Sequence, residues 1–281
     1  MFLPGFVPVC RRHGPGLKNK YLEYGYKMSN SPVSIVILAA GLGTRMKSDK
    51  AKVLHEIAGK SMLSYVLDAA LTVTACEHVV VVVGCQAEAV RAEAAKKGGV
   101  RFAFQERQLG TGHAVQCALD ALSEETGDVV ILCGDVPFIA GDTICRLVAA
   151  HRQEARAVTL LSVALENPTG YGRVIRDPEG NVSRIIEEAD ASEQEREINV
   201  VNAGIYCVKK DFLAWALSRI EPHNAQNEIY LTDIIGVAYT NKRRIGTLVC
   251  PDADEVIGVN SRADLARAEE RMAAGLRGKT S

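Results

Sequence analysis

Residues 33–46 read "VSIVILAAGLGTRM", an apolar run that leads directly into a glycine-rich loop. This order is typical of a buried parallel strand that ends at a phosphate-binding turn. Two common templates, the dinucleotide fingerprint and the P-loop, nearly fit, but both require glycine at position 46, where the chain has Met46. The stretch therefore predicts a phosphate site of another kind.

Apolar runs and helical patterns alternate from Val33 to about Leu165. The expected strands are 33–40, 78–84, 100–104, 128–133 and 157–165, and the expected helices are 61–71, 87–97, 112–122 and 141–151. Continuous apolar strands separated by short helices favour a mostly parallel, Rossmann-like α/β sheet with helices on both faces. Ligands of such sheets bind beyond the carboxyl ends of the strands, where the loop at 39–46 and "GDVP" at 134–137 both fall.

The pattern changes after residue 166. The stretch "GRVIRDPEGNVSRIIEE" predicts a hairpin that turns at residues 177–180, and "VVNAGIYCV" predicts another strand. We expect a mostly antiparallel addition that forms a wall over the same sheet edge. A further helix is expected to begin near Ser261, where Ser261 and Asp264 form a capping-box pattern.

Composition limits the classes of function. The 281 residues are 47% hydrophobic and 24% charged with a net charge of -1, so we expect an ordinary globular protein without a basic field for nucleic acid. No apolar segment reaches the roughly 20 residues of a membrane span. The eight cysteines are scattered without a C-x-x-C pair, which predicts reduced thiols and a cytoplasmic location.

Individual residues near these turns have both functional and ordinary interpretations. Asp135 suits a magnesium ion beside phosphates, although it also suits a plain turn. Arg45 can bind phosphate oxygens with its guanidinium, or form a surface ion pair, while Lys52 alone could be a solvated surface lysine. Gln105 could contact a base edge as donor and acceptor, and the glycines Gly110 and Gly112 that follow could serve the turn alone.

Eight stretches taken together carry a resemblance to a known family. They are "LAAGLGTRMKSDKAKVLHEIAGKSML", "QERQLGTGHA", "GDVP", "NPTGYGRVIRD", "IIEEADAS", "VNAGIY", "NEIYLTDII" and "VIGVNSR". In this order they resemble the bacterial N-acetylglucosamine-1-phosphate uridyltransferases, from about Val33 to Arg262. The first stretch marks only the wider sugar nucleotidyltransferase superfamily, whereas "LGTGHA" combined with "PTGYGR" and "GVN" is more specific.

The resemblance implies a nucleotide-diphospho-sugar transferase fold and a reaction of UTP with an N-acetylhexosamine 1-phosphate, giving a UDP-sugar and pyrophosphate. It implies Mg²⁺ bound by Asp135 and Asn260, and phosphates contacted by Arg45 and Lys52. The sugar and its acetamido group would be bound by Gly172, Glu187 and Asn202. The implied nucleotide-binding residues are Leu38, Ala39, Ala40, Gly41, Gly43, Gln105, Gly110, Thr111 and Gly134.

The chain is expected to divide into three parts. Residues 1–30 are expected to be a disordered extension or a misassigned start, 31–262 the nucleotidyltransferase domain, and 263–281 a C-terminal helix and tail. Within the domain, about 31–165 would bind nucleotide and 166–260 the sugar. Since no hexapeptide repeat is present, we expect no acetyl transfer, and we expect a monomer or dimer.

Some positions depart from the family pattern, and other functions compete with this one. Ala51 stands where proline is usual, Ala189 where lysine is usual, and Asn227 where glycine is usual. The rival functions are nucleotidyl transfer to another sugar phosphate, an activity like that of molybdenum cofactor guanylyltransferases, or a catalytically silent domain that binds UDP-sugars and regulates a partner.

Overall fold

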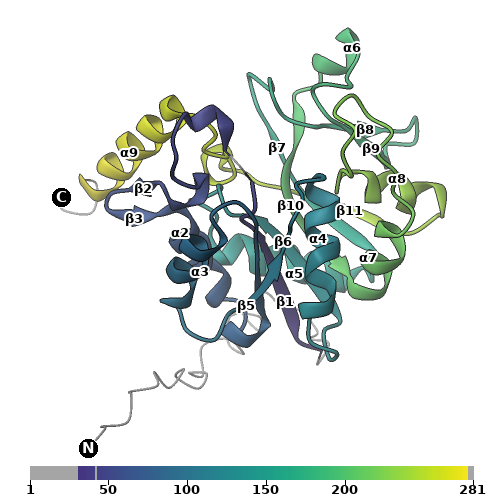
Figure 1. Ribbon diagram of the computed structural model, residues 1–281. Helices are drawn as coiled ribbons and strands as arrows, with labels where there is room; N and C mark the ends of the chain where they lie inside the picture. The colour runs from purple at the N-terminus through teal and green to yellow at the C-terminus, as the bar shows by residue number, and fades with distance from the viewer. Residues whose placement is uncertain (1–30, 42, 278–281) are drawn as a thin grey trace, which may run out of the picture.

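The computed structural model describes residues 31–41 and 43–277, so the expectation for residues 1–30 lies outside the described residues. Its centre is one mixed sheet with strand order β11-β7-β10-β6-β1-β4-β5 (Figure 1). The strands are β1 (Val33–Leu38), β4 (Val79–Val83), β5 (Arg101–Phe104), β6 (Asp128–Cys133), β7 (Val158–Ala164), β10 (Val200–Lys209) and β11 (Ile245–Val249). All five strands expected before residue 166 are confirmed.

The parallel half of the sheet brings the predicted turns together. Strand β1 lies between β4 and β6 and runs parallel to both, with Leu38 in register with Val82 on one side and Cys133 on the other. All three strands therefore end at one edge. The loop after β1 and the turn after β6 meet there, as expected for an open α/β sheet.

The later part of the chain does not stay outside this sheet. The predicted hairpin is present as β8 (Arg173–Arg176) and β9 (Val182–Ile186), which pair antiparallel. Strand β10, however, lies between β6 and β7 and runs antiparallel to both. Its residues 201–203 and 205–208 are buried, which suits a central strand covered on both faces. The sequence pattern changes at residue 166, but strands from both sides of this position belong to the same sheet.

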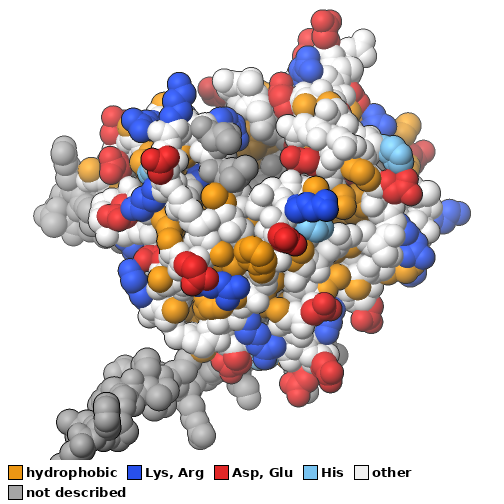
Figure 2. Space-filling model, viewed as in Figure 1, with side chains coloured by type: hydrophobic (Ala, Val, Ile, Leu, Met, Phe, Trp, Pro, Cys, Tyr) orange, Lys and Arg blue, Asp and Glu red, His pale blue; other side chains and the backbone are white. Residues whose placement is uncertain are grey.

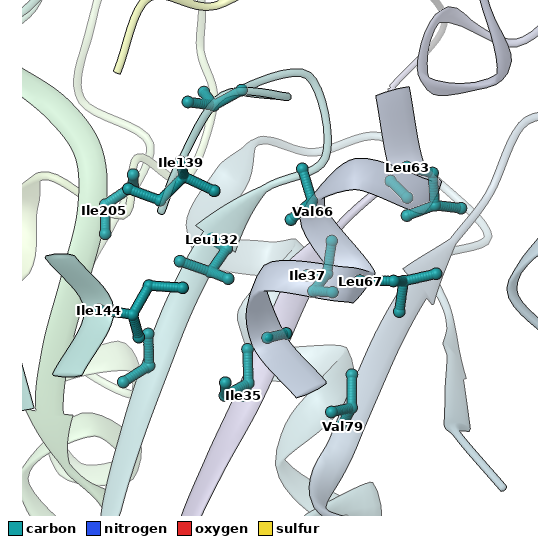
Figure 3. Packing of buried hydrophobic residues seen from close by; sticks show 14 of the residues in the cluster. Ile35, Ile37, Leu63, Val66, Leu67, Val79, Leu132, Ile139, Ile144 and Ile205 are labelled. Carbon is teal, nitrogen blue, oxygen red and sulfur yellow. The ribbon is translucent and has the colours of Figure 1, made fainter. Parts of the chain in front are cut away.

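Helices cover both faces of the sheet (Figure 1). One face is packed by α2 (Met62–Leu71), α3 (Ala87–Ala95) and α5 (Gly141–Gln153), and the other by α4 (Thr111–Ala118), α7 (Lys210–Leu217) and α8 (Asp233–Thr240). Figure 3 shows the first layer, where Leu63, Val66 and Leu67 of α2 pack toward Ile35 and Ile37 of β1. The predicted two-faced α/β architecture is confirmed.

Two short strands and two helices complete the fold. The strands β2 (Glu56–Ile57) and β3 (Lys60–Ser61) form a separate ribbon, α6 (Glu193–Arg196) is one turn, and α9 (Arg262–Arg277) ends the described chain. The capping box before α9 is confirmed, since the Ser261 backbone N–H donates to Asp264 Oδ2 at 2.8 Å and the Asp264 N–H donates to Ser261 Oγ at 3.2 Å. Ala268 of α9 packs against Ile57 and Met62, which holds the helix on the ribbon.

The surface is mixed in charge. Figure 2 shows acidic and basic side chains interspersed over the face in view, rather than one basic field. Within the part of the chain that the structure describes, no helix is both long enough and apolar enough to cross a membrane.

Candidate active site

A cavity of about 420 Å³ opens at the carboxyl edge of the parallel strands. It is lined by Leu38, Ala39, Ala40, Gly41, Gly43, Lys52, Val53, Gln105, Gln108, Gly110, Thr111, Ala114, Cys133, Asp135 and Glu228. Most of the residues predicted to hold a nucleotide or its phosphates are in this lining. The structure therefore brings together the loops after β1, β5 and β6, which are far apart in sequence.

The glycine-rich loop adopts a backbone that explains its departure from both phosphate templates. Gly43 has a φ of 64°, and a Cβ there would lie 2.6 Å from Cβ of Lys52, so a side chain is excluded. The loop then forms a short 3₁₀ turn (Thr44–Met46) in place of a long helix, and Met46 is fully buried. The position where the templates require glycine is thus a packed core residue.

Gly134 lets the turn after β6 approach this loop. Its backbone N–H donates to the carbonyl oxygen of Leu38 at 2.9 Å. A Cβ at Gly134 would lie 2.9 Å from that oxygen and 3.0 Å from Val53 Cγ1. Gly134 is outside the cavity lining, but its lack of a side chain lets the turn that carries Asp135 lie close to the end of β1.

Two cations and two oxygen donors form a cluster at the rim of the cavity. The Lys52 ammonium lies 2.5 Å from Asp135 Oδ2 and 3.1 Å from Asn260 Oδ1, and Arg45 Nη2 donates to the same Asn260 oxygen at 3.1 Å. The side chains of Lys52 and Asp135 are only 19% and 16% exposed, so this ion pair is poorly hydrated. Lys50, by contrast, points to Glu56 at the surface.

Asn260 reaches the cluster because the segment before α9 is fastened to the site. The Val259 N–H donates to the Asp135 carbonyl at 2.8 Å, and the Asn260 N–H donates to Asp264 Oδ2 at 3.0 Å. The Arg262 guanidinium donates to the carbonyls of Met46 and Lys47 at 3.2 and 3.0 Å. Sequence reasoning missed Arg262 as a support, although its place at the end of "VIGVNSR" was a signal for it.

The same oxygens suit a hard divalent cation. Asp135 Oδ2 and Asn260 Oδ1 both lie within 3.1 Å of one point, the Lys52 nitrogen, so they converge on a single positive charge. Mg²⁺ is commonly held by one or two protein oxygens, with waters and substrate phosphates completing its shell. Across the described residues, no group of three or more His, Cys, Asp or Glu side chains forms a closed metal site. The donor set therefore fits a metal shared with a substrate.

The turn after β5 is held against a distant segment. The Gly112 N–H donates to the Ile229 carbonyl and the Ile229 N–H to the Leu109 carbonyl, both at 2.7 Å, and Thr111 Oγ1 accepts from the Leu231 N–H at 3.0 Å. Glu228 of this segment lines the cavity, as does Gln108 of the turn. Neither residue was predicted, since their positions depend on this contact between two loops.

Gly110 is expected to tolerate no side chain. Its φ is 111°, and a Cβ would lie 2.5 Å from the Ile229 carbonyl oxygen. We expect Gly110→Ala to lower the free energy of unfolding by about 2 kcal/mol, because strained backbone and overlap act together. Gly41→Ala is the matched control, since a Cβ at Gly41 meets nothing within 4 Å. Urea unfolding of both variants measures this, and equal stability of the two would contradict the assignment.

The predicted sugar residues form a second group, outside the cavity lining. The Asn202 N–H donates to the Gly172 carbonyl at 2.8 Å, and a Cβ on Gly172 would lie 3.2 Å from Glu187 Oε2. Asn202 Nδ2 donates to the hydroxyl of the buried Tyr206 at 2.6 Å. The hairpin β8–β9 and β10 thus place Gly172, Glu187 and Asn202 together. Tyr206 was not predicted as part of this group.

This group is linked to the nucleotide cavity through Cys133. Its thiol donates to the Gly204 carbonyl at 3.4 Å, and burial raises the pKa of Cys133 to about 12, so it stays neutral. Burial also raises the pKa of Glu187, and the nearby charges of Asp233 and Asp190 raise it further. The carboxyl group of Glu187 is therefore poorly hydrated.

Asp233, the first residue of α8, makes stability depend on pH. Burial, and then the charge of Asp190, raises its pKa from 3.8 to about 6. Between these pH values the folded chain binds more protons than the unfolded chain, so stability falls as pH rises through this window. We expect Asp233→Asn to raise the free energy of unfolding at pH 7.5 by about 1 kcal/mol, after allowance for solvent screening, and not at pH 4.

The matched control for this prediction is Asp211→Asn. Asp211 is also a first-turn aspartate of a helix of the same length, α7, but it is exposed, so it reports the loss of helix-dipole stabilisation alone. Urea unfolding at pH 4, 6 and 7.5 compares the two variants. A stabilisation by Asp233→Asn that does not grow with pH would contradict the predicted titration.

Two departures from the family pattern have structural reasons. The Ala51 N–H donates to Gln86 Oε1 at 2.9 Å, a hydrogen bond that a proline could not make. Asn227 has a φ of 53°, in the left-handed region that glycine favours and that asparagine tolerates best among other residues. Ala189 is exposed, and nothing in the structure explains its difference from lysine.

Comparisons with known proteins identify relatives of this chain. A family model described as "MobA-like NTP transferase domain" matches residues 35–179. The bifunctional protein GlmU of Trichlorobacter lovleyi is 49% identical over 233 residues, which cover 83% of this chain and 50% of that protein. The GlmU of Desulfotalea psychrophila is 46% identical over 242 residues, 86% of this chain and 71% of that protein. The chain spans about half the length of several such relatives.

Solved structures share the fold at low sequence identity. A Bacillus anthracis protein described as a glucose-1-phosphate thymidylyltransferase superposes with a TM-score of 0.65 at 17% identity, covering 85% of this chain and 94% of its own. The 4-diphosphocytidyl-2C-methyl-D-erythritol synthase of Anaerococcus prevotii gives 0.62 at 15%, covering 87% and 100%. The solved structures thus share the fold, and the family match and the relatives show that the chain belongs to the MobA-like NTP transferase family and groups with the GlmU proteins.

Proposed function

We propose that this chain transfers a uridylyl group from UTP to N-acetylglucosamine 1-phosphate, giving UDP-N-acetylglucosamine and pyrophosphate. The observation that carries the proposal is the Lys52–Asp135–Asn260–Arg45 cluster at the rim of the nucleotide cavity. The relatives that are nearly half identical over most of this chain support it.

The reaction needs positioning and charge neutralisation rather than a covalent nucleophile. A phosphate oxygen of the sugar phosphate attacks the α-phosphorus of UTP, the bond to the β-phosphate oxygen breaks in line, and pyrophosphate leaves with its negative charge. Arg45 and Lys52 would contact the phosphates and stabilise the leaving pyrophosphate. Backbone groups of Leu38, Ala39, Ala40, Gly41 and Gly43 would hold the triphosphate against the sheet edge.

A divalent metal belongs to this proposal. Sugar nucleotidyltransferases of this family generally use one, and we propose Mg²⁺ held by Asp135 and Asn260. When bound, it would neutralise phosphate charge and polarise the reacting phosphoryl group. Because Lys52 lies against both oxygens, its ammonium would have to move toward the phosphates as the metal takes those oxygens.

The acceptor sugar would lie against the hairpin β8–β9 and β10. Glu187 would accept hydrogen bonds from sugar hydroxyls, and Asn202, held by Tyr206, would present its amide to the acetamido group. Gly172 leaves the room that a side chain would fill beside Glu187. The proposed division is thus nucleotide binding by about 31–165 and sugar binding by about 166–260, with Thr111, Gly110 and Gln105 at the uracil.

The site does not favour a silent binding module. A domain that only binds UDP-sugars needs no partly buried lysine, carboxylate and amide aimed at the reacting phosphates, yet all three converge here. We further propose that the enzyme acts in the cytoplasm on these small substrates, as a monomer or dimer. We propose no acetyl transfer for the 281 residues of this sequence.

A panel of acceptors, namely sugar 1-phosphates and a molybdenum cofactor precursor, against the four ribonucleoside triphosphates and TTP, with and without Mg²⁺, tests the proposal. Pyrophosphate release is the readout. We expect turnover with UTP and N-acetylglucosamine 1-phosphate in the presence of Mg²⁺. Turnover of another pair would establish a different nucleotidyltransferase, GTP with a molybdenum cofactor precursor among them, and none in any combination would favour the regulatory alternative.

A further inference from the structure

Gln105 is a buried polar side chain at the edge of the nucleotide cavity. It follows β5 directly, its N–H extends the sheet by donating to the Val83 carbonyl at 2.8 Å, and it is only 3% exposed. Its amide nitrogen Nε2 lies 3.1 Å from the Gly110 carbonyl oxygen and 3.1 Å from His113 Nδ1. Both contacts come from the turn that begins α4.

These two contacts fix the orientation of the amide. A backbone carbonyl can only accept, so the group facing Gly110 must be the NH₂ and not Oε1. The reverse orientation would place two acceptor oxygens 3.1 Å apart. The amide nitrogen has two hydrogens, and the second is directed to His113 Nδ1. Only Oε1, an acceptor, is left for a ligand in the cavity that Gln105 lines.

The imidazole of His113 has a second contact at its other ring nitrogen, Nε2. If Nδ1 accepts from Gln105, the ring proton is on Nε2, which faces the Cys117 sulfur at 3.8 Å. Burial raises the pKa of the Cys117 thiol, so that sulfur is neutral and can accept weakly. His113 is in the first turn of α4 and is partly buried, which keeps the ring in place.

We propose that His113 is a positioning residue that makes base recognition by Gln105 acceptor-only, so the cavity selects bases that present a ring N–H. Uracil, thymine and guanine carry such a hydrogen on the pairing edge. Cytosine and adenine present a ring lone pair there and could donate to Oε1 only from the exocyclic amino group beside it. The sequence alone allowed Gln105 to act as both donor and acceptor toward a base, and the proposal keeps only the acceptor role. The inference rests on the proposed function only in placing the base against Gln105.

Binding measurements on the full chain, without sugar phosphate, test this directly. Titration calorimetry with UDP, GDP, CDP and ADP compares the wild type, His113→Leu, which removes the acceptor, and His113→Asn, which can restore it through Oδ1. In His113→Leu the Gly110 carbonyl is the one remaining restraint on the amide, and the second amide hydrogen loses its acceptor. We expect this variant to lower the ratio of UDP to CDP affinity about tenfold, the effect of one oriented hydrogen bond, and His113→Asn to recover most of it. An unchanged ratio in His113→Leu would overturn the proposal.

A second pair of variants separates positioning from a structural role. In a Gln105→Leu background, His113→Leu should not change the UDP to CDP ratio further, because His113 acts through Gln105. The inference would be overturned if the double variant had a lower UDP to CDP affinity ratio than Gln105→Leu, or if Gln105→Leu alone kept the wild-type ratio. The Gln105→Leu comparison with the wild type can still be made if His113→Leu is unstable. Preference for GDP over ADP and CDP without UDP binding would refute the proposed uridylyl transfer and support the acceptor-only site.

Discussion

Replacing Lys52 by alanine is expected to slow uridylyl transfer by about 10²-fold or more, roughly 2.7 kcal/mol of transition-state stabilisation. The Lys52 side chain is about four-fifths buried and its ammonium lies against Asp135 and Asn260, so its charge is poorly screened by water. Removing it would leave the leaving pyrophosphate without one of its two cations. Arg45→Ala is expected to act in the same direction. Steady-state kinetics with saturating Mg²⁺ measure both.

Lys50→Ala is the matched control for this prediction. Lys50 lies two residues away and is 45% exposed in a surface ion pair with Glu56, so its loss should leave turnover within about twofold. If Lys52→Ala kept turnover within a factor of three of the wild type, or if Lys50→Ala slowed the enzyme as much, the assignment of Lys52 to the phosphates would be wrong.

Asp135→Asn is expected to lower turnover by roughly 10² to 10³-fold and to weaken metal binding. The substitution keeps the shape of the side chain but removes the negative charge that a divalent cation requires. It also leaves the Lys52 ammonium, 19% exposed, without its anionic partner. The measurements are turnover across a Mg²⁺ titration and Mn²⁺ binding by paramagnetic resonance, which needs no turnover.

Asp120→Asn controls for the loss of one negative charge. Asp120 is exposed in a short turn and does not line the cavity, so metal binding and turnover should remain those of the wild type. Mn²⁺ affinity of Asp135→Asn equal to that of Asp120→Asn would remove Asp135 from the metal site, whatever its effect on turnover.

Much of the fold could be predicted from local patterns. Continuous valine and isoleucine runs such as β1 and β4 have no polar side to show to water, so they must be central strands between helices. The position of Asp135 at the end of such a run predicts its place at the ligand-binding edge. β10 could not be placed in the same way, because its insertion between β6 and β7 depends on pairings with partners up to 81 residues apart, as between Lys209 and Asp128.

The site was predicted residue by residue only with the help of the family resemblance. Asn260 is a surface-type residue in an unremarkable stretch, and it meets Lys52 only because Val259 and Arg262 fasten that stretch to distant loops. Gln108, Glu228 and Tyr206 gave no signal of their own, since each owes its place to packing between segments. The orientation of Gln105 was also hidden, because it depends on its contacts with the Gly110 carbonyl and the His113 ring.

The way Arg262 and Asn260 join the first loop has a consequence for synthesis of the chain. Arg45 and Lys52 leave the ribosome early, but the residue that joins them, Asn260, is made more than 200 positions later. Parallel strands and such distant contacts form slowly. A growing chain can therefore assemble β1, β4 and β5 well before the proposed phosphate cluster is complete, because that cluster needs the segment of Asn260 and Arg262.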